Sequence, residues 1–142
     1  MSRHIPIEEQ LARVPLFEGV SESDLQRIAH LVARIHEPAG EVLTKEGEAG
    51  HELMIVLDGE VEVRHGDRVV ATLGSGDYLG EVALLEHDGR RSATAVATTA
   101  VTIAFISRHD FENLIADVPH LAERVKATEA ARLADLGGDE AT

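Results

Sequence analysis

The stretch from Gly74 to Ala97 combines residue types that are suited to binding phosphate. It reads GSGDYLGEVALLEHDGRRSATAVA, with glycines at positions 74, 76 and 80 ahead of a short apolar run. Glycine allows positive φ and close approach of the backbone to a ligand. The run from Glu81 to Leu85 is long enough for about one helical turn, whose first amides lack internal partners and point at an anion. Arg91 adds a positive charge and a planar fork of donors. The stretch therefore predicts a phosphate site.

Glu81 indicates what else the ligand carries. A carboxylate repels a phosphate unless it accepts a hydrogen bond from another group, such as a sugar hydroxyl. A 3′,5′-cyclic nucleotide fits, because its 2′-OH lies beside the cyclised phosphate. Each residue also has a simpler explanation: the glycines as a turn, Glu81 as a carboxylate at a helix N-terminus, and Arg91 as a surface side chain paired with Glu86 or Asp88. Their combination favours the ligand.

The same stretch resembles the phosphate-binding cassette of cyclic nucleotide-binding domains, the family of the catabolite activator, the regulatory subunit of protein kinase A and cyclic nucleotide-gated channels. Gly80-Glu81 matches the family's Gly-Glu, Ala83-Leu84 its small-apolar pair, and Arg91-Ser92-Ala93 its Arg-Ser/Thr/Ala-Ala. Ten residues lead from Glu81 to Arg91, as in the catabolite activator. The resemblance implies that Glu81 binds the ribose. It also implies a set of phosphate-binding residues: Gly80, Val82, Ala83, Arg91 and Ser92.

The resemblance also indicates where the base would lie. Val70 and Ala71 are expected near the pocket wall, and the last helix is expected to cover the base with Arg132, Leu133 and Leu136. The catabolite activator has a hydroxyl for adenine near the position of Leu136, so the residue that caps the base stays open here. We expect cAMP as the ligand because it is common in the family, and cGMP as a possible one because Ser92 does not reject it.

Composition narrows the class of protein. The chain has 142 residues, which suits one domain. Its 13 Lys and Arg against 26 Asp and Glu give a formal charge of −13, which disfavours direct nucleic acid binding. There is no cysteine, and the sequence shows neither a signal peptide nor an apolar run of roughly 18 residues. We expect a cytoplasmic protein without membrane attachment, either a monomer or a homodimer.

The sequence does not indicate catalysis. Its eight histidines include no His-x-His and no His-Glu-x-x-His, so neither a metal nor a cupin-type centre is expected. A nucleophilic cysteine is absent, and so is a Gly-x-Ser-x-Gly elbow. We therefore predict a binding protein, not an enzyme, with no cofactor beyond its nucleotide ligand.

The remaining chain predicts the elements that position this stretch. Ser21 to Asp24 is close to a capping box and starts a helix over Ser23 to Val32. Ser107 opens a second helix, and Pro119 starts a last one that Gly137-Gly138 ends at Leu136. Asp58-Gly59 predicts a hairpin, as does His65-Gly66-Asp67. Strand-like runs begin at Arg34 and recur over Glu41–Thr44, Leu53–Leu57, Val61–Val63, Val69–Leu73, Ala93–Ala97 and Val101–Ile106.

These runs match the family's β-roll. The predicted fold is α+β, mostly β: an eight-stranded antiparallel, jelly-roll-like β-roll with N-terminal helices, two C-terminal helices and a short cassette helix between strands 6 and 7. We expect one domain over 1–142, with the N-terminal helix and roll at 16–106, the C-terminal helices at 107–136 and a tail at 137–142. Two functions fit: a receptor that signals to a partner protein through its C-terminal helix, or a ligand-free interaction module or fragment of a larger regulator or channel.

Overall fold

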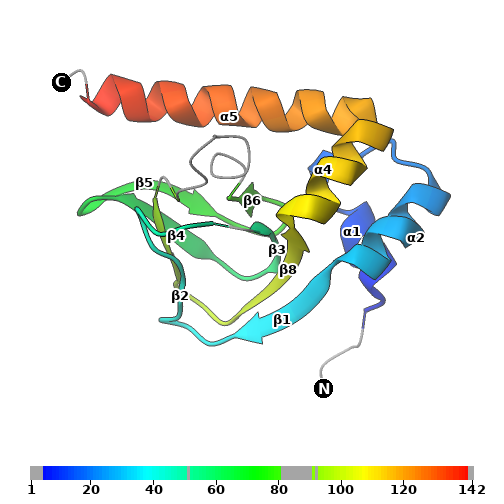
Figure 1. Ribbon diagram of the computed structural model, residues 1–142. Coiled ribbons are helices and arrows are strands. Elements are labelled where there is room, and N and C mark those ends of the chain that lie inside the picture. Colours follow the sequence, from blue (N-terminus) through cyan, green and yellow to red (C-terminus); the bar gives the residue numbers. More distant parts are fainter. Residues whose placement is uncertain (1–4, 51, 81–90, 92, 141–142) are drawn as a thin grey trace.

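The computed structural model describes residues 5–50, 52–80, 91 and 93–140; in the last helix, side chains are described for 119–128, 130 and 131. Two four-stranded antiparallel sheets form the body, and helices lie at both ends of the chain (Figure 1). This confirms the predicted eight-stranded, mostly β architecture. The helices are α1 (Ile7–Ala12), the 3-10 helix η1 (Pro15–Phe17), α2 (Glu22–Leu31), α4 (Arg108–Asp117) and α5 (Pro119–Glu140).

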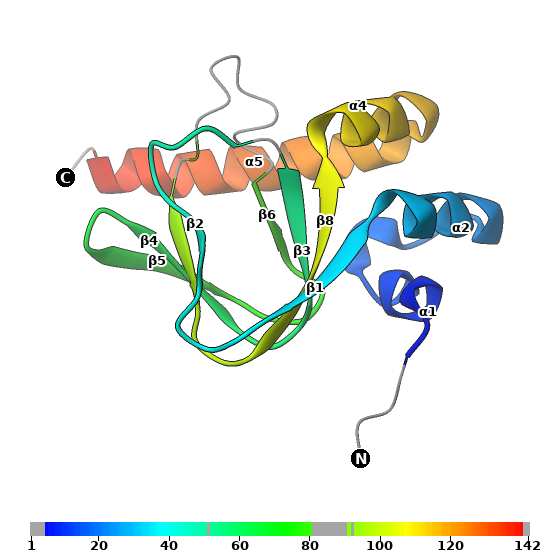
Figure 2. The ribbon, with the colours of Figure 1, turned by 60° about the horizontal axis from the view of Figure 1, so that its bottom comes forward.

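The eight strands divide equally between two sheets. The first has the order β1-β8-β3-β6 and the second the order β2-β7-β4-β5. In Figure 2 the two sheets lie opposite one another, with α5 running across one end of both. The strand bounds are β1 (Ala33–Glu37), β2 (Val42–Thr44), β3 (Glu52–Asp58), β4 (Val61–His65), β5 (Arg68–Leu73), β6 (Tyr78–Leu79), β7 (Thr94–Ala97) and β8 (Val101–Ser107).

Strand β3 contributes side chains to two hydrophobic cores, one on each of its faces. Met54 and Val56 pack between the sheets, with residues of β4, β5, β7 and β8. Leu53 and Ile55 face the other way and pack against the helices. Because side chains alternate between the faces of a strand, a strand covered on both faces is apolar at successive positions. That is why Leu53–Leu57 reads as one apolar run.

The helix starts follow the capping chemistry of the sequence. Ser21 precedes α2, and its Oγ accepts a hydrogen bond from the backbone N–H of Asp24 at 3.1 Å. Ser107 precedes α4 and accepts in the same way from Asp110 at 3.2 Å. Each hydroxyl satisfies an amide that the helix itself leaves without a partner. Both predicted caps are confirmed, although α2 begins one residue before the predicted Ser23 and ends one residue before Val32.

Of the two predicted hairpins, one forms. His65 pairs with Arg68 across the turn that joins β4 to β5. The hairpin at Asp58-Gly59 is wrong, because β3 pairs with β6 and β8 while β4 belongs to the other sheet. Gly59 does turn the chain, with φ of +97°, but a Cβ there would come 2.9 Å from Cα of Val101. The turn therefore packs against the β7–β8 connection and crosses between sheets.

The predicted end of the last helix is also wrong. Helix α5 continues through Gly137-Gly138 to Glu140, so that the first four residues of the expected tail are helical. A glycine ends a helix when the chain turns back and an apolar residue after it packs on the last turn. The residues that follow Gly138 in the sequence are Asp139 and Glu140, so the apolar residue of such a turn is missing there.

Helix α5 is tied to the N-terminal region by Arg124. Its Nη1 donates to the carbonyl oxygens of Leu16 and Glu18, both at 2.7 Å. Leu121 and Val125, on the same helix, are buried in the core that also holds Leu16. The last helix and the 3-10 turn therefore form one packed unit.

Candidate functional site

Arg91 is held in place through its backbone. Its N–H donates to the carbonyl of Glu48 at 2.8 Å, and its own carbonyl accepts from the N–H of Gly47 at 2.9 Å. Two residues further on, the carbonyl of Ala93 accepts from the hydroxyl of Thr44 at 3.0 Å. The return of the chain from the cassette into β7 is thus bonded to the Gly-rich turn between β2 and β3. This fixes where the Arg91 side chain starts.

Two glycines make room for the Arg91 side chain. A Cβ at Gly50 would collide with Nε and lie 2.7 Å from Cδ and Cζ. A Cβ at Gly80 would collide with Nη1 and lie 2.7 Å from the carbonyl oxygen of Glu52. Gly80 also has φ of +98°, a conformation that L residues rarely adopt. Arg91 therefore passes over both glycines and ends beside Gly80.

This arrangement brings together the two ends of the predicted phosphate site that the structure describes. Nη1 of Arg91 is buried, while the residue as a whole is partly exposed. A partly desolvated guanidinium makes stronger charge-assisted hydrogen bonds than one in open water. The geometry fits a small oxyanion held beside the Gly80 backbone.

Several predicted site residues lie outside the described part of the chain. Glu81, Val82, Ala83 and Ser92 are among them, as is the predicted cassette helix, so their roles stay predictions. Arg132, Leu133 and Leu136 lie within α5, but their side chains are outside the description.

The two base-contact candidates on the roll differ in their surroundings. Ala71 pairs with Val63 across the hairpin and packs against the core between the sheets. Val70 precedes it on β5 and is partly buried. Because neighbouring residues of a strand point to opposite faces, the two are not expected to contact one base together.

A contact that the sequence analysis missed joins the site to the last helix. The Tyr78 hydroxyl donates to Oγ1 of Thr128 on α5 at 2.7 Å, and Oγ1 of Thr128 in turn donates to the carbonyl of Arg124 at 3.2 Å. Tyr78 lies two residues before Gly80 and is 8% exposed, whereas Thr128 is partly exposed. The sequence did contain a hint of this contact, because the only tyrosine of the chain stands two residues before the Gly80-Glu81 pair.

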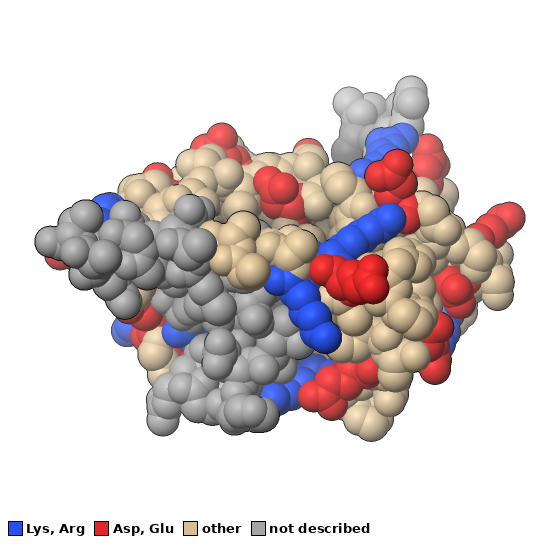
Figure 3. All heavy atoms as spheres, turned by 90° about the horizontal axis from the view of Figure 1, so that it is seen from above, with Lys and Arg blue, Asp and Glu red and all other residues tan. Residues whose placement is uncertain are grey.

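The charges around this end of the molecule are mixed. Viewed from the α5 side, basic side chains of the described residues lie next to acidic ones and do not gather in one area (Figure 3). Within the described residues, no group of three or more His, Asp or Glu is arranged to hold a metal ion. No helix of that part of the chain has the length and apolar character needed to span a membrane.

Comparison with known proteins gives matches over most of the chain. The family model of the cyclic nucleotide-binding domain matches residues 34–118. A cyclic nucleotide-gated potassium channel of Rhizobium etli is 34% identical over 122 residues, covering 86% of this chain and 34% of the channel. The cAMP-dependent protein kinase regulatory subunit of Schizosaccharomyces pombe is 34% identical over 109 residues, covering 76% of this chain and 26% of the subunit.

Solved structures agree with these sequence matches. The crystal structure of the Thermus thermophilus catabolite activator protein has a TM-score of 0.75 and 33% identity, covering 88% of this chain and 62% of that one. The chain thus spans about a third or less of the length of the two curated relatives. The family match, the shared fold and the position of Arg91 beside Gly80 lead to one conclusion: the chain belongs to the family of cyclic nucleotide-binding domains.

Proposed function

We propose that this chain is a non-catalytic receptor domain for a cyclic nucleotide, with cAMP preferred, and that ligand binding moves its C-terminal helices. The observation that carries the proposal is the path of Arg91, whose side chain crosses Gly50 and ends beside Gly80. Gly80 and Arg91 match the Gly-Glu and Arg-Ser-Ala parts of the family's cassette motif. A guanidinium beside a backbone that lacks Cβ atoms is suited to a singly charged phosphodiester.

The roles of the residues follow from their chemistry. Arg91 pairs with the phosphate, together with the backbone of Gly80, Val82 and Ala83 and the hydroxyl of Ser92. Glu81 accepts from the ribose 2′-OH. The base lies between the roll, at Val70 or Ala71, and the last turns of α5. No metal and no further cofactor takes part.

The proposed helix movement rests on how α5 is attached. Tyr78 is part of the core beside the helices, two residues before Gly80, and its hydroxyl is bonded to Thr128. A ligand that shifts Gly80 would shift β6 and this bond with it. It moves the helix only as far as it binds one arrangement more tightly than the other. The moving helix would pass the signal to a protein partner.

The setting that we propose is cytoplasmic, as a monomer or a homodimer, without direct contact with DNA. The formal charge of −13 supports the last point, because phosphate backbones repel an acidic surface.

A second function is a ligand-free interaction module, or a piece of a larger regulator or channel. The lengths of the relatives bear only on the second of these, a piece of a larger protein, since the chain covers 34% of the Rhizobium etli channel and 26% of the Schizosaccharomyces pombe subunit. A ligand-free module differs from the receptor in one measurable property, which is its affinity for cyclic nucleotides.

Calorimetric titration with cAMP and cGMP tests the proposal. We expect saturable binding of cAMP to the purified chain and a rise in melting temperature, because a ligand that binds only the folded state stabilises it. Binding of cGMP with equal or higher affinity would contradict the stated preference. No heat and no thermal shift with either nucleotide at about 1 mM, where even weak sites fill, would favour the ligand-free module.

The bond between Tyr78 and Thr128 gives a test of helix movement. We expect Tyr78→Phe and Thr128→Val to show a coupling free energy of about 1 kcal/mol in a double-mutant cycle of unfolding, as is usual for one hydrogen bond. The cycle is then repeated with saturating cAMP. A change in the coupling free energy supports movement of α5 at this turn, whereas equal coupling in both states contradicts it.

A further inference from the structure

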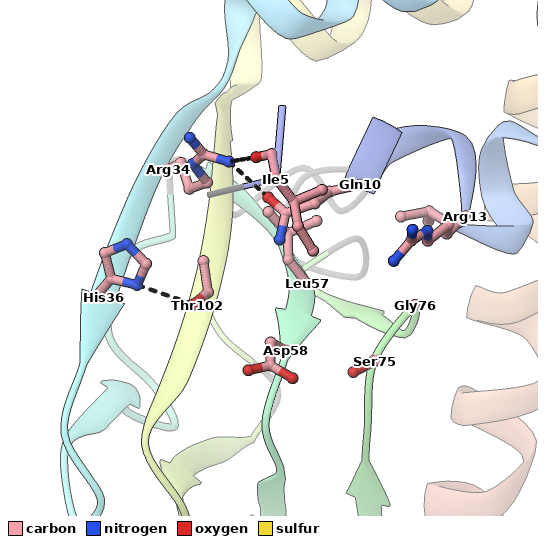
Figure 4. A pocket seen from close by; sticks show the side chains of 11 residues that line it. Ile5, Gln10, Arg13, Arg34, His36, Leu57, Asp58, Ser75, Gly76 and Thr102 are labelled. Carbon is pink, nitrogen blue, oxygen red and sulfur yellow. Dashed lines mark hydrogen bonds between the residues drawn. The ribbon is translucent and has the colours of Figure 1, made fainter. Parts of the chain in front are cut away.

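A cavity lies at the other end of β3 from Arg91. Its volume is about 580 Å³, and it is enclosed by the outer face of the first sheet, helix α1 and the β5–β6 turn (Figure 4). Glu52, whose carbonyl adjoins Gly80, begins β3, and Asp58, which lines the cavity, ends it. A strand of seven residues is about 20 Å long. The cavity therefore lies at the opposite end of β3 from Gly80 and Arg91.

The floor of the cavity is a row of polar side chains on three neighbouring strands. His36 on β1 is opposite Thr102 on β8, and Thr102 is opposite Asp58 on β3. Nδ1 of His36 and Oγ1 of Thr102 are 2.9 Å apart and share a hydrogen bond. No hydrogen bond or ion pair joins the Asp58 carboxylate to another described residue. The floor therefore offers an acceptor to a ligand.

Two arginines border the cavity near helix α1. Arg34 is partly buried, and its Nη1 donates to the carbonyl of Ile5 at 2.7 Å and to Oε1 of Gln10 at 2.8 Å. These contacts leave Nε and Nη2 without partners among the described residues. Arg13 extends from the end of α1 on the opposite side, above Gly76, and pairs with Glu9 at 3.0 Å (Figure 4). Because the Arg13 side chain is 64% exposed, that ion pair is weak and exchangeable.

We propose that this cavity is a second binding site, for a small organic anion that also carries hydroxyl or ammonium donors. The two guanidinium groups would hold its phosphate or carboxylate, and Asp58 would accept from its donors. The lining carries two arginines and one carboxylate, although the chain as a whole has a formal charge of −13. Its volume is within the usual range for small-molecule sites. The proposal does not rest on cyclic nucleotide binding.

An occupant would also connect two parts of the fold. Arg13 belongs to the helical segment, whereas His36 and Asp58 belong to the sheet. A ligand bound to both would hold α1 against the sheet and would raise the melting temperature in proportion to its occupancy.

The test is an NMR titration of the isotopically labelled chain with two probes, D-ribose 5-phosphate and L-aspartate, up to about 20 mM, which detects millimolar binding. Ribose is the uncharged control. We expect saturable shifts of amides around the cavity, at Arg34, His36, Asp58 and Gly76, and a higher melting temperature with the same probe. Binding of D-ribose 5-phosphate would show that the site takes a phosphate, and binding of L-aspartate that it takes a carboxylate. Either result supports the proposal.

Matched variants separate a built site from general attraction of ions. Arg13→Gln should lower the affinity of the chain for the probe by about 5-fold, which is the effect of losing one exposed charged contact. Arg64→Gln removes the same charge from a similar ion pair, between Arg64 and Glu62 on β4, and should have no effect. Shifts should persist in Arg91→Ala, which separates this site from the cassette. No saturable shift at the cavity with either probe, or equal weakening by Arg13→Gln and Arg64→Gln, overturns the proposal.

Discussion

Replacing Arg91 by alanine is expected to lower the affinity for cAMP by about 10 to 100-fold, which is the effect of one pair of charge-assisted hydrogen bonds. The side chain is removed, but the backbone bonds of Arg91 to Gly47 and Glu48 are kept. The strand that leaves the cassette should therefore stay in place. Calorimetry measures the affinity, and thermal unfolding shows whether the variant is folded.

Two further variants make this result specific. Arg91→Lys keeps the charge but not the planar fork, and we expect an affinity between those of the wild type and Arg91→Ala. Arg64→Ala removes an arginine that pairs with Glu62 on the surface of the roll, and should leave the affinity unchanged. If Arg91→Ala binds cAMP as tightly as the wild type does, Arg91 is not the phosphate ligand and the proposed site is wrong.

The second large effect is expected for Gly80→Ala. The new Cβ would collide with Nη1 of Arg91 and lie 2.7 Å from the carbonyl of Glu52, at φ of +98°. We expect the free energy of unfolding to fall by about 1 to 3 kcal/mol, because a non-glycine residue in this conformation is strained. We also expect at least a 10-fold loss of cAMP affinity, roughly one lost contact, because Arg91 is displaced.

Gly40→Ala is the matched control. Gly40 has φ of +93°, so its backbone cost is similar, but no atom lies within 4 Å of a Cβ built there. We expect a loss of stability without a change in cAMP affinity. Chemical denaturation and calorimetry on both variants separate backbone strain from displacement of Arg91. Equal effects of the two substitutions on both quantities would show that the contact between Gly80 and Arg91 does not matter for binding.

Local chemistry was readable from the chain because it depends on residues close in sequence. The serines at 21 and 107 cap their helices by accepting a hydrogen bond from the amide three residues further along the chain. The turn at His65-Gly66-Asp67 needed only its own backbone conformation. The motif from Gly80 to Arg91 predicted the family, since its residue types and spacing are specific. In each case the physical cause acts over a few residues, and the pattern of the sequence contains it.

Contacts between distant segments could be decided only by the packed structure. Asp58-Gly59 has the local features of a hairpin, yet its strands join different sheets because β3 finds its partners in β6 and β8. Gly50 is needed because the Arg91 side chain passes over it. The bond from Tyr78 to Thr128 and the row of His36, Thr102 and Asp58 likewise join residues from separate elements. Burial and register, which arise only when the whole chain packs, determine these contacts.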